Sequence, residues 1–373
     1  MIPLARPCIG DEELRAVEAV LRSGRLVQGE HVQAFERLVA HESGLAFAVA
    51  VSSGTAALMI AIEAAGVRPG DHVATSAYSW PATANAIVRN GAVPVFVDIE
   101  PSTFNLDPES LARTLDENPR IKAVIPVHAF GAVADMTRIQ PLAQQAGVAL
   151  IEDAACALGS TLAMGSSRAS AGSFGVAGCF SFHPRKTFTT GEGGAIVTND
   201  PNVVRRARAL RNHGLDPDSE APDFCEAGYN FRMTEIQAAL GVCQLGKLRR
   251  LLDGRRALAV TYERLLRGSA IRAPVEPIGG GHSFQSYVVL LPPAWSGTRA
   301  NLIRSLRGRG VEVQIGTVHV PLTSYFRRFG HRLGDFPITD DIAERALSLP
   351  MYEGLKRDEQ QVVVEALVAE LSS

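Results

Sequence analysis

One lysine stands where its side chain could do covalent chemistry. Lys186 follows the apolar run 178–180 and precedes the glycine-rich turn 190–194. An amine held just beyond a strand can be partly buried beside a carbonyl compound and act as a nucleophile. The spacing therefore predicts that Lys186 reacts with a carbonyl group.

A turn of small residues offers a place for an anion. Ser53, Gly54 and Thr55 lie between an apolar run, 45–51, and a helical pattern, 56–65. Unpaired N–H groups and the dipole at the start of that helix would attract a phosphate. An ordinary Ser/Thr helix cap explains the same residues, so both interpretations stay open.

An acid and an aromatic residue also follow apolar runs. Asp153 comes after 149–151, at the edge of the sheet where open α/β folds bind ligands, and its carboxylate could pair with a ring nitrogen. A helix cap or a metal ligand is an equally good interpretation. Trp80 comes shortly after 74–76 and could stack on a planar cofactor, although a tryptophan in the core is the other interpretation.

One cofactor would use all four of these features. Pyridoxal 5'-phosphate needs an amine for its aldehyde, an acid for its ring nitrogen, an aromatic face and a phosphate site. The turn at Gly54, then Trp80, Asp153 and Lys186 occur in this order along the chain. Their combination predicts a pyridoxal phosphate enzyme.

The elements that position these residues alternate between strands and helices. Short apolar runs near 74–76, 93–97, 123–127, 149–151, 179–182 and 195–198 are separated by helical patterns. Runs that are apolar on both faces predict a mainly parallel, seven-stranded type of sheet between helices, hence an α/β fold. The small polar segment 165–172 is expected to form a surface loop.

The pattern changes after residue 241. Leucines spaced for a long amphipathic helix begin at Leu248, and the strands and helices that follow predict a smaller α+β domain. Helices are expected at 301–307, 340–347 and 358–371, and strands at 283–291 and 311–320. We therefore expect a large cofactor-binding domain over 1–245 and a small domain over 246–373.

Composition narrows the class of protein. The 373 residues are 46% hydrophobic and carry a net charge of -2, from 37 basic and 39 acidic residues, without a basic stripe for nucleic acid or a membrane surface.

The stretch 45–67 has one charge and is about long enough to cross a bilayer, but the turn at 52–55 favours a strand followed by a buried helix. Five cysteines without a C-x-x-C pair argue against a disulfide framework and a zinc site. The N-terminal residues lack the pattern of a signal peptide. We expect a cytoplasmic protein with no metal.

The chain resembles the DegT/DnrJ/EryC1/StrS family of sugar aminotransferases over nearly its whole length. That family has the fold-type I architecture of aspartate aminotransferase. The matching segments are 53–58, 82–87, 97–99, 104–107, 126–128, 152–155, 180–184, 190–194, 211–214 and 229–235.

The resemblance assigns roles to individual residues. It implies that Lys186 is the Schiff-base lysine, that Asp153 pairs with the pyridine nitrogen and that Trp80 stacks on the ring. Cys156 stands where relatives commonly have Gln, His or Glu, and it is expected beside the cofactor as a weaker partner of the ring hydroxyl or as an inert thiol. Relatives that dehydrate sugars have a histidine in place of the lysine, so Lys186 favours amino transfer.

The resemblance also implies how the phosphate is held. Gly54, Thr55 and Ser181 would bind it within one subunit, and Asn230 would reach the phosphate of the neighbouring subunit. The active site would then be shared across a homodimer.

Several polar residues have open roles. His183, His213 and His319 are candidates to contact substrate, and each could instead be structural. His128 follows a strand and has the same two interpretations. Arg232 and Glu235 are three positions apart at the start of a helix, which suits a structural pair as well as a functional role.

The expected reaction transfers an amino group from an amino acid, glutamate by family habit, to a keto sugar. A nucleotide-linked 4-keto-6-deoxy sugar is the leading acceptor, in polysaccharide or secondary-metabolite sugar biosynthesis. A 3-keto sugar or a keto-cyclitol is the alternative acceptor. A non-catalytic regulatory protein that binds the same cofactor, and a lyase that uses it, are the alternative functions.

Overall fold

The computed structural model describes residues 1–277 and 279–372, and its centre is a seven-stranded sheet. All of its strands run parallel except β10, which is antiparallel to both neighbours. The prediction of a mainly parallel sheet is confirmed. In spatial order the strands are β1 (Phe47–Val51), β10 (Gly194–Thr198), β9 (Ala177–Ser181), β6 (Ala149–Asp153), β5 (Ile121–Ile125), β2 (His72–Ser76) and β4 (Val93–Val97).

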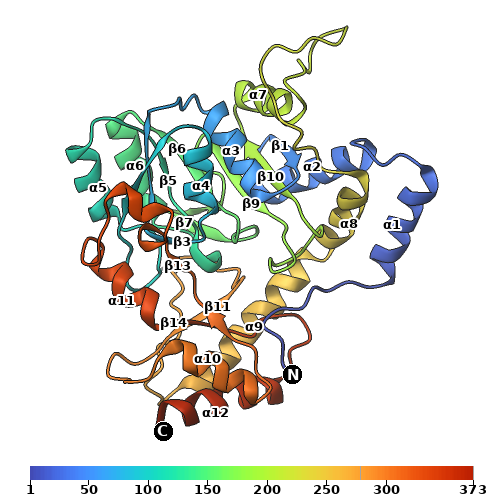
Figure 1. Ribbon diagram of the computed structural model, residues 1–373. Helices are drawn as coiled ribbons and strands as arrows, with labels where there is room; N and C mark the ends of the chain where they lie inside the picture. The colour runs from blue at the N-terminus through green and yellow to red at the C-terminus, as the bar shows by residue number, and fades with distance from the viewer. Residues whose placement is uncertain (278, 373) are drawn as a thin grey trace.

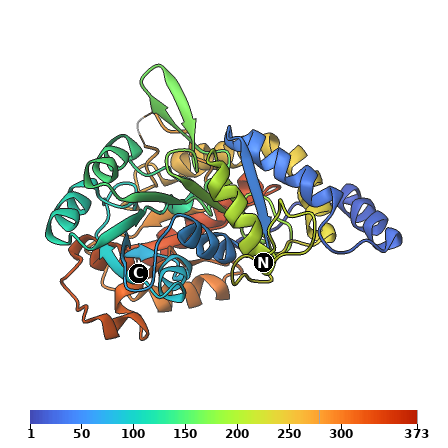
Figure 2. The same ribbon diagram turned by 90° about the horizontal axis from the view of Figure 1, so that it is seen from above.

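Helices cover both faces of this sheet (Figures 1 and 2). The strands are buried along most of their length, which is why they read as continuous apolar runs. One face packs against α3 (Gly54–Ala64), α4 (Ala82–Arg89) and α7 (Pro201–Arg211). The other packs against α2 (Glu30–Ser43), α5 (Pro108–Glu117), α6 (Met136–Ala146) and α8 (Glu235–Gly246), and α1 (Asp11–Ser23) lies against α8.

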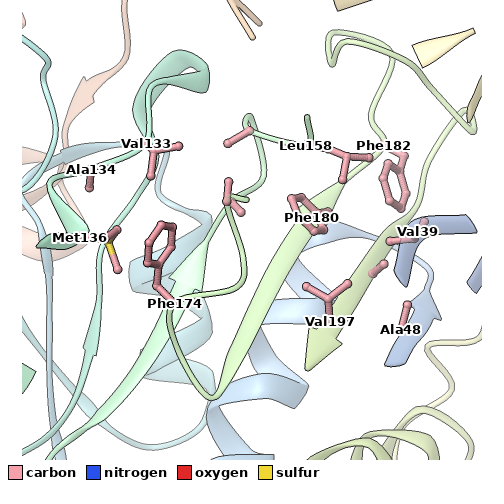
Figure 3. Close-up of a cluster of buried hydrophobic side chains, with 14 of the residues drawn as sticks. Val39, Ala48, Val133, Ala134, Met136, Leu158, Phe174, Phe180, Phe182 and Val197 are labelled. Atoms are coloured by element: carbon pink, nitrogen blue, oxygen red, sulfur yellow. The ribbon is translucent and has the colours of Figure 1, made fainter. Parts of the chain in front are cut away.

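The core on the α2 and α8 side fixes the strand that leads to Lys186. Phe180 and Phe182 lie beside Val39 and Val197 in Figure 3 and are almost completely buried. The ring of Phe182 stacks on Phe188 with centroids 5.0 Å apart, and it meets Phe35 edge-on at 5.1 Å. Aromatic packing on both sides of Lys186 therefore anchors the chain that carries it.

The C-terminal part forms a separate layer around a three-stranded sheet (Figure 1). The helix predicted at 340–347 extends too far. Residues 346–349 instead form the central strand of this sheet and are buried between its two neighbouring strands. The division of the chain at residue 245 stays a prediction. The elements of this layer are α9 (Leu248–Leu266), β11 (Tyr287–Leu290), α10 (Arg299–Gly308), β12 (Gln314–Ile315), α11 (Pro337–Arg345), β14 (Ala346–Leu349) and α12 (Arg357–Ser372).

Short elements connect the two layers. β3 (Tyr78–Ser79), just before Trp80, pairs with β13 (Val318–His319), and two short 3₁₀ turns, η2 (Val320–Leu322) and η3 (Phe326–Phe329), follow. A third turn, η1 (Ala129–Gly131), follows β5. The C-terminal layer thus contacts the segment that carries the expected stacking residue.

Two further expectations have clear outcomes. The prediction of a surface loop over 165–172 is wrong. Within this segment β8 (Ser167–Ser170) pairs with β7 (Thr161–Met164) in a hairpin that projects at the top of Figure 2. Arg168 donates to the hydroxyl of Thr161 across it. The stretch 45–67 is a strand and a buried helix, as expected, and no helix in the described parts of the chain has the length and apolar character needed to cross a membrane.

Candidate active site

Asp153 ends β6 at the carboxyl edge of the parallel sheet. Its side chain is almost fully buried and accepts a hydrogen bond of 2.6 Å from the hydroxyl of Thr83, at the start of α4. The backbone N–H of Ala155 donates to its other oxygen at 3.1 Å. Within residues 1–277 and 279–372, no cationic side chain pairs with Asp153. A buried carboxylate without a cation is costly unless a positively charged group binds there.

Glu152, the preceding residue, is also buried but faces a different set of partners. Its two oxygens accept from the backbone N–H groups of Gly172, Phe174 and Gly175 at 2.6–2.9 Å, and Nε2 of His128 lies 2.9 Å away. The Nδ1 atom of His128 accepts from the N–H of Ala134, so Nε2 carries the proton. His128 is therefore a structural residue here, which resolves its two interpretations.

Lys186 lies in the loop between β9 and β10. Its Nζ atom is 3.1 Å from the Sγ atom of Cys156, and its backbone N–H donates to the carbonyl of His183 at 2.8 Å. Because Cys156 is three residues after Asp153, this contact brings the amine to the same edge of the sheet as the buried carboxylate. No carboxylate forms an ion pair with Lys186 in the described residues, so the amine is not held in a structural salt bridge.

The small-residue turn supplies a tight cradle at the start of α3. Ser53 caps this helix by accepting from the N–H of Ala56 at 3.1 Å, so the cap interpretation is correct for Ser53. A Cβ atom on Gly54 would lie 2.7 Å from the Cβ of Ser181, which leaves room only for glycine. The helix N-terminus and Ser181 thus meet as expected for an anion site, with Thr55 exposed beside them.

The remaining expected cofactor residues are exposed. Trp80 is 67% exposed, so it is not a core residue and its ring is free to stack on a ligand. Asn230 is also exposed and forms an isolated bridge with Asn212. Both positions leave the side chains accessible to a cofactor or to a second copy of the chain.

The three candidate substrate histidines have different surroundings. His183 is partly exposed, and burial lowers its pKa; the carboxylate of Glu192 opposes this shift, whereas the charges of Lys186 and Arg185 add to it. His213 is exposed and has a positive φ of 61°. His319 is mostly buried, and its Nε2 atom lies 2.8 Å from Oδ1 of Asp340.

The sequence did not reveal one partner of Asp153, and one possible side-chain pair does not form. Thr83 belongs to a recognised segment, but only the fold shows that its hydroxyl meets Asp153. Arg232 and Glu235 do not pair, because α8 begins at Glu235 and Arg232 instead donates to Asn212 at 2.6 Å. Glu235 accepts from backbone N–H groups at the start of α2.

These residues fit pyridoxal phosphate. A buried carboxylate that forms no ion pair with the described residues suits a protonated ring nitrogen. An amine that forms no ion pair with them suits an aldehyde, and the cradle of Gly54 and Ser181 suits a phosphate. The sheet order and this site define a fold-type I, pyridoxal phosphate-dependent transferase.

The chain belongs to the DegT/DnrJ/EryC1/StrS aminotransferase family, whose model matches residues 7–368. It is a pyridoxal phosphate-dependent aminotransferase. A pleiotropic regulatory protein of Geobacillus stearothermophilus is 37% identical, covering 95% of this chain and 93% of that protein. SpsC, a spore coat polysaccharide biosynthesis protein of Bacillus subtilis, is 36% identical, with 98% and 96% covered. GDP-perosamine synthase of Caulobacter vibrioides is 36% identical, with 91% and 90% covered.

Solved structures agree over the whole chain. The putative sugar aminotransferase Spr1654 of Streptococcus pneumoniae superposes with a TM-score of 0.93, at 26% identity, covering 100% of this chain and 99% of that one. It has been solved in PLP and PMP forms. PseC of Helicobacter pylori, an aminotransferase of pseudoaminic acid biosynthesis, superposes with a TM-score of 0.92 at 28% identity, with 100% and 99% covered.

Proposed function

We propose that this chain transfers an amino group from glutamate to a nucleotide-linked 4-keto-6-deoxy sugar. The observation that carries the proposal is that Lys186, an amine without a carboxylate partner among the described residues, contacts Cys156, three residues after the buried carboxylate of Asp153. The names of the relatives support a sugar acceptor, since GDP-perosamine synthase and a polysaccharide biosynthesis protein are among them. A cytoplasmic setting in sugar biosynthesis is part of the proposal.

Each residue has a stated task in this proposal. Asp153 binds the protonated ring nitrogen of the cofactor, and Thr83 orients that carboxylate through its 2.6 Å hydrogen bond. When bound, pyridoxal phosphate supplies an aldehyde that accepts the amine and a ring that accepts electrons. Gly54, Thr55 and Ser181 would hold the phosphate, and Trp80 would cover the ring.

Lys186 also has a task in proton transfer. Once its Nζ atom is free, it would take the proton from the donor carbon that gives up the nitrogen, and it would later deliver a proton to the acceptor carbon that receives the nitrogen. Its contact with Cys156 keeps the amine near this edge of the sheet without a charged partner. The proposal therefore uses Lys186 both as the cofactor-binding amine and as the acid–base group.

We further propose that two copies of the chain share each site. Asn230 is exposed, as a residue that reaches into a neighbouring subunit must be before assembly. His183, His213 and His319 remain proposed substrate-contacting residues. His183 is the leading candidate among them, because it lies in the same loop as Lys186.

Replacement of Lys186 tests the proposal. Lys186→Ala should abolish the conversion of glutamate to 2-oxoglutarate in the presence of a keto-sugar acceptor, and Lys122→Ala, at an exposed position in β5, should retain it. Persistent transamination by Lys186→Ala would overturn the assignment. A panel of nucleotide-linked 4-keto and 3-keto sugars and a keto-cyclitol then identifies the acceptor.

A non-catalytic regulatory function is the second candidate, favoured by the name of the 37% identical relative. A binding protein would take up the cofactor but give no steady release of 2-oxoglutarate with any acceptor. A lyase would consume the sugar without consuming glutamate. The same assay therefore separates all three functions.

A further inference from the structure

A segment of the C-terminal layer contacts both loops that meet at Lys186. Residues 282–286, here called the strap, precede β11. Within the strap, the hydroxyl of Ser283 donates to the backbone carbonyl of Cys156 at 3.1 Å. The side-chain amide of Gln285 donates to the backbone carbonyl of Arg185 at 2.7 Å. The strap thus holds the residue before Lys186 and the residue whose thiol contacts its amine.

The strap is itself held firmly. The N–H groups of Ser283 and Ser286 donate to the carbonyls of Gly131 and Phe130 at 3.3 Å. A Cβ atom on Gly131 would lie 2.1 Å from the hydroxyl of Ser283, so only glycine allows this approach. Ser283 is completely buried and Gln285 nearly so. Buried donors with one good acceptor each keep a fixed geometry.

A buried arginine links the strap to two other elements. Arg255 in α9 donates through Nη1 to the carbonyls of Phe284 and Gln285 at 3.1 and 3.0 Å, and to the carbonyl of Met351 at 3.3 Å. Burial lowers the pKa of Arg255 to about 10, and the carboxylate of Glu353 opposes this shift. The guanidinium group stays charged at neutral pH and fixes the strap to α9 and to the chain after β14.

We infer that Gln285 is a positioning residue for the Lys186 amine, and that Ser283 supports it by holding the loop of Cys156. One hydrogen bond holds the loop of Lys186 and the other holds the loop of Cys156. Both come from the C-terminal layer, and together they set the distance between Nζ of Lys186 and Sγ of Cys156. The inference rests on the proposed function, because it takes Lys186 as the reacting amine. It predicts that the C-terminal layer controls where that amine points.

Two substitutions of Gln285 test this role. Gln285→Glu keeps the oxygen that accepts from the hydroxyl of Ser286 at 3.2 Å but loses the N–H that donates to Arg185. Gln285→Leu loses the same donor without adding charge. In both variants we expect kcat to fall about tenfold or more, with KM for glutamate changed by less than about threefold, because a misplaced catalytic group slows the reaction more than it weakens binding.

A spectroscopic measurement separates positioning from general loss of structure. The visible absorption of the bound cofactor depends on pH, and the midpoint of this change should move by about half a pH unit or more in both Gln285 variants. Thermal unfolding is followed in parallel. A fall in kcat with an unmoved midpoint would mean a purely structural role and would overturn the inference.

Gln314 supplies the matched control. Its side-chain oxygen accepts from the guanidinium group of the same Arg185 at 2.8 Å, so Gln314→Glu keeps that contact and adds a comparable charge. We expect native kcat and a native midpoint for this variant. An equal change in Gln314→Glu and Gln285→Glu, with none in Gln285→Leu, would assign the effect to charge and contradict the inference.

A smaller change covers the case in which the Gln285 variants do not fold. Ser283→Ala removes one oxygen and should shift the midpoint in the same direction by a smaller amount. A native midpoint in folded Ser283→Ala would then count against the inference. If Lys186→Ala kept its activity, the proposed function itself would fail; if Lys186 is essential and the strap variants are native-like, only the positioning role fails.

Discussion

Two neighbouring carboxylates at the end of β6 have opposite surroundings. Glu152 accepts from three backbone N–H groups and lies 2.9 Å from His128, so its hydrogen-bonding capacity is filled by the protein. Among residues 1–277 and 279–372, only the hydroxyl of Thr83 and one backbone N–H donate to the side chain of Asp153. Both are buried, and successive residues in a strand point to opposite faces.

From this difference we propose that Glu152 is a structural acid and Asp153 a functional one. Glu152 ties the loop 172–175 to β6 and needs nothing from outside the chain. Asp153 has a charge that the described protein residues leave without a cation. In our proposal the protonated ring nitrogen of the cofactor supplies the positive partner that lowers the cost of burying this carboxylate.

The largest effect is expected from Asp153→Asn. The amide keeps the shape: its oxygen can accept from the N–H of Ala155 while its NH₂ group donates to the hydroxyl oxygen of Thr83, but it cannot hold a proton on the ring nitrogen. We expect kcat to fall about 100- to 1000-fold, as when a preorganised electrostatic group is removed, while the free energy of unfolding changes by less than about 1 kcal/mol. Steady-state kinetics and urea unfolding check the two parts. A large loss of stability would show that Asp153 is structural like Glu152.

The reverse pattern is expected for Glu152→Gln. One end of the new amide is an NH₂ group that faces the N–H donors of the loop 172–175, so we expect unfolding free energy to fall by about 2–4 kcal/mol. The folded variant should keep most of its kcat. Glu117→Gln, at an exposed position, is the control for stability. A loss of activity as large as in Asp153→Asn would erase the distinction between the two acids.

The sequence alone predicts part of the fold and of the candidate site, and the rest depends on contacts between distant residues. Apolar runs predicted the strands, because each run is a local pattern. The cofactor was predicted from four short motifs, at Gly54, Trp80, Asp153 and Lys186, each of which can be recognised within a few residues. The partners of Glu152 lie about 20 residues away, and Thr83 meets Asp153 across 70 positions, so only the fold reveals them. Similarly, the strand at 346–349 looked like the end of a helix, because its burial depends on neighbours far along the chain.

A smaller effect is expected from Thr83→Val. The substitution keeps the volume but removes the hydroxyl that donates to Asp153, leaving the carboxylate free to turn. We expect about a tenfold fall in kcat, the typical value of one hydrogen bond to a charged group. Thr83→Ser retains the hydroxyl and should be close to native. If Thr83→Ser lost activity and Thr83→Val kept it, packing of the methyl group and not orientation of Asp153 would explain the effect.

The smallest effect concerns pH and a third buried carboxylate, Glu13 in α1. Burial alone would raise its pKa, but hydrogen bonds from Lys247, Gln244 and the N–H of Gly10 outweigh burial and lower the pKa to about 2, from an ordinary value of 4.5. Because the folded value is the lower one, the stabilisation is complete above pH 4.5 and is lost as the pH falls towards 2.

Glu13→Gln should therefore be less stable than the native protein at pH 7 but lose less stability between pH 5 and 2. We expect the difference in melting temperature, a few degrees at neutral pH, to shrink over about this range. Glu235, whose pKa is also lowered, remains in both proteins and cancels in the comparison. Melting temperatures that fall in parallel in the two proteins would show that Glu13 does not cause the loss of stability at low pH. Its hydrogen bonds would then be structural, like those of Glu152, without a measurable effect on the pH dependence.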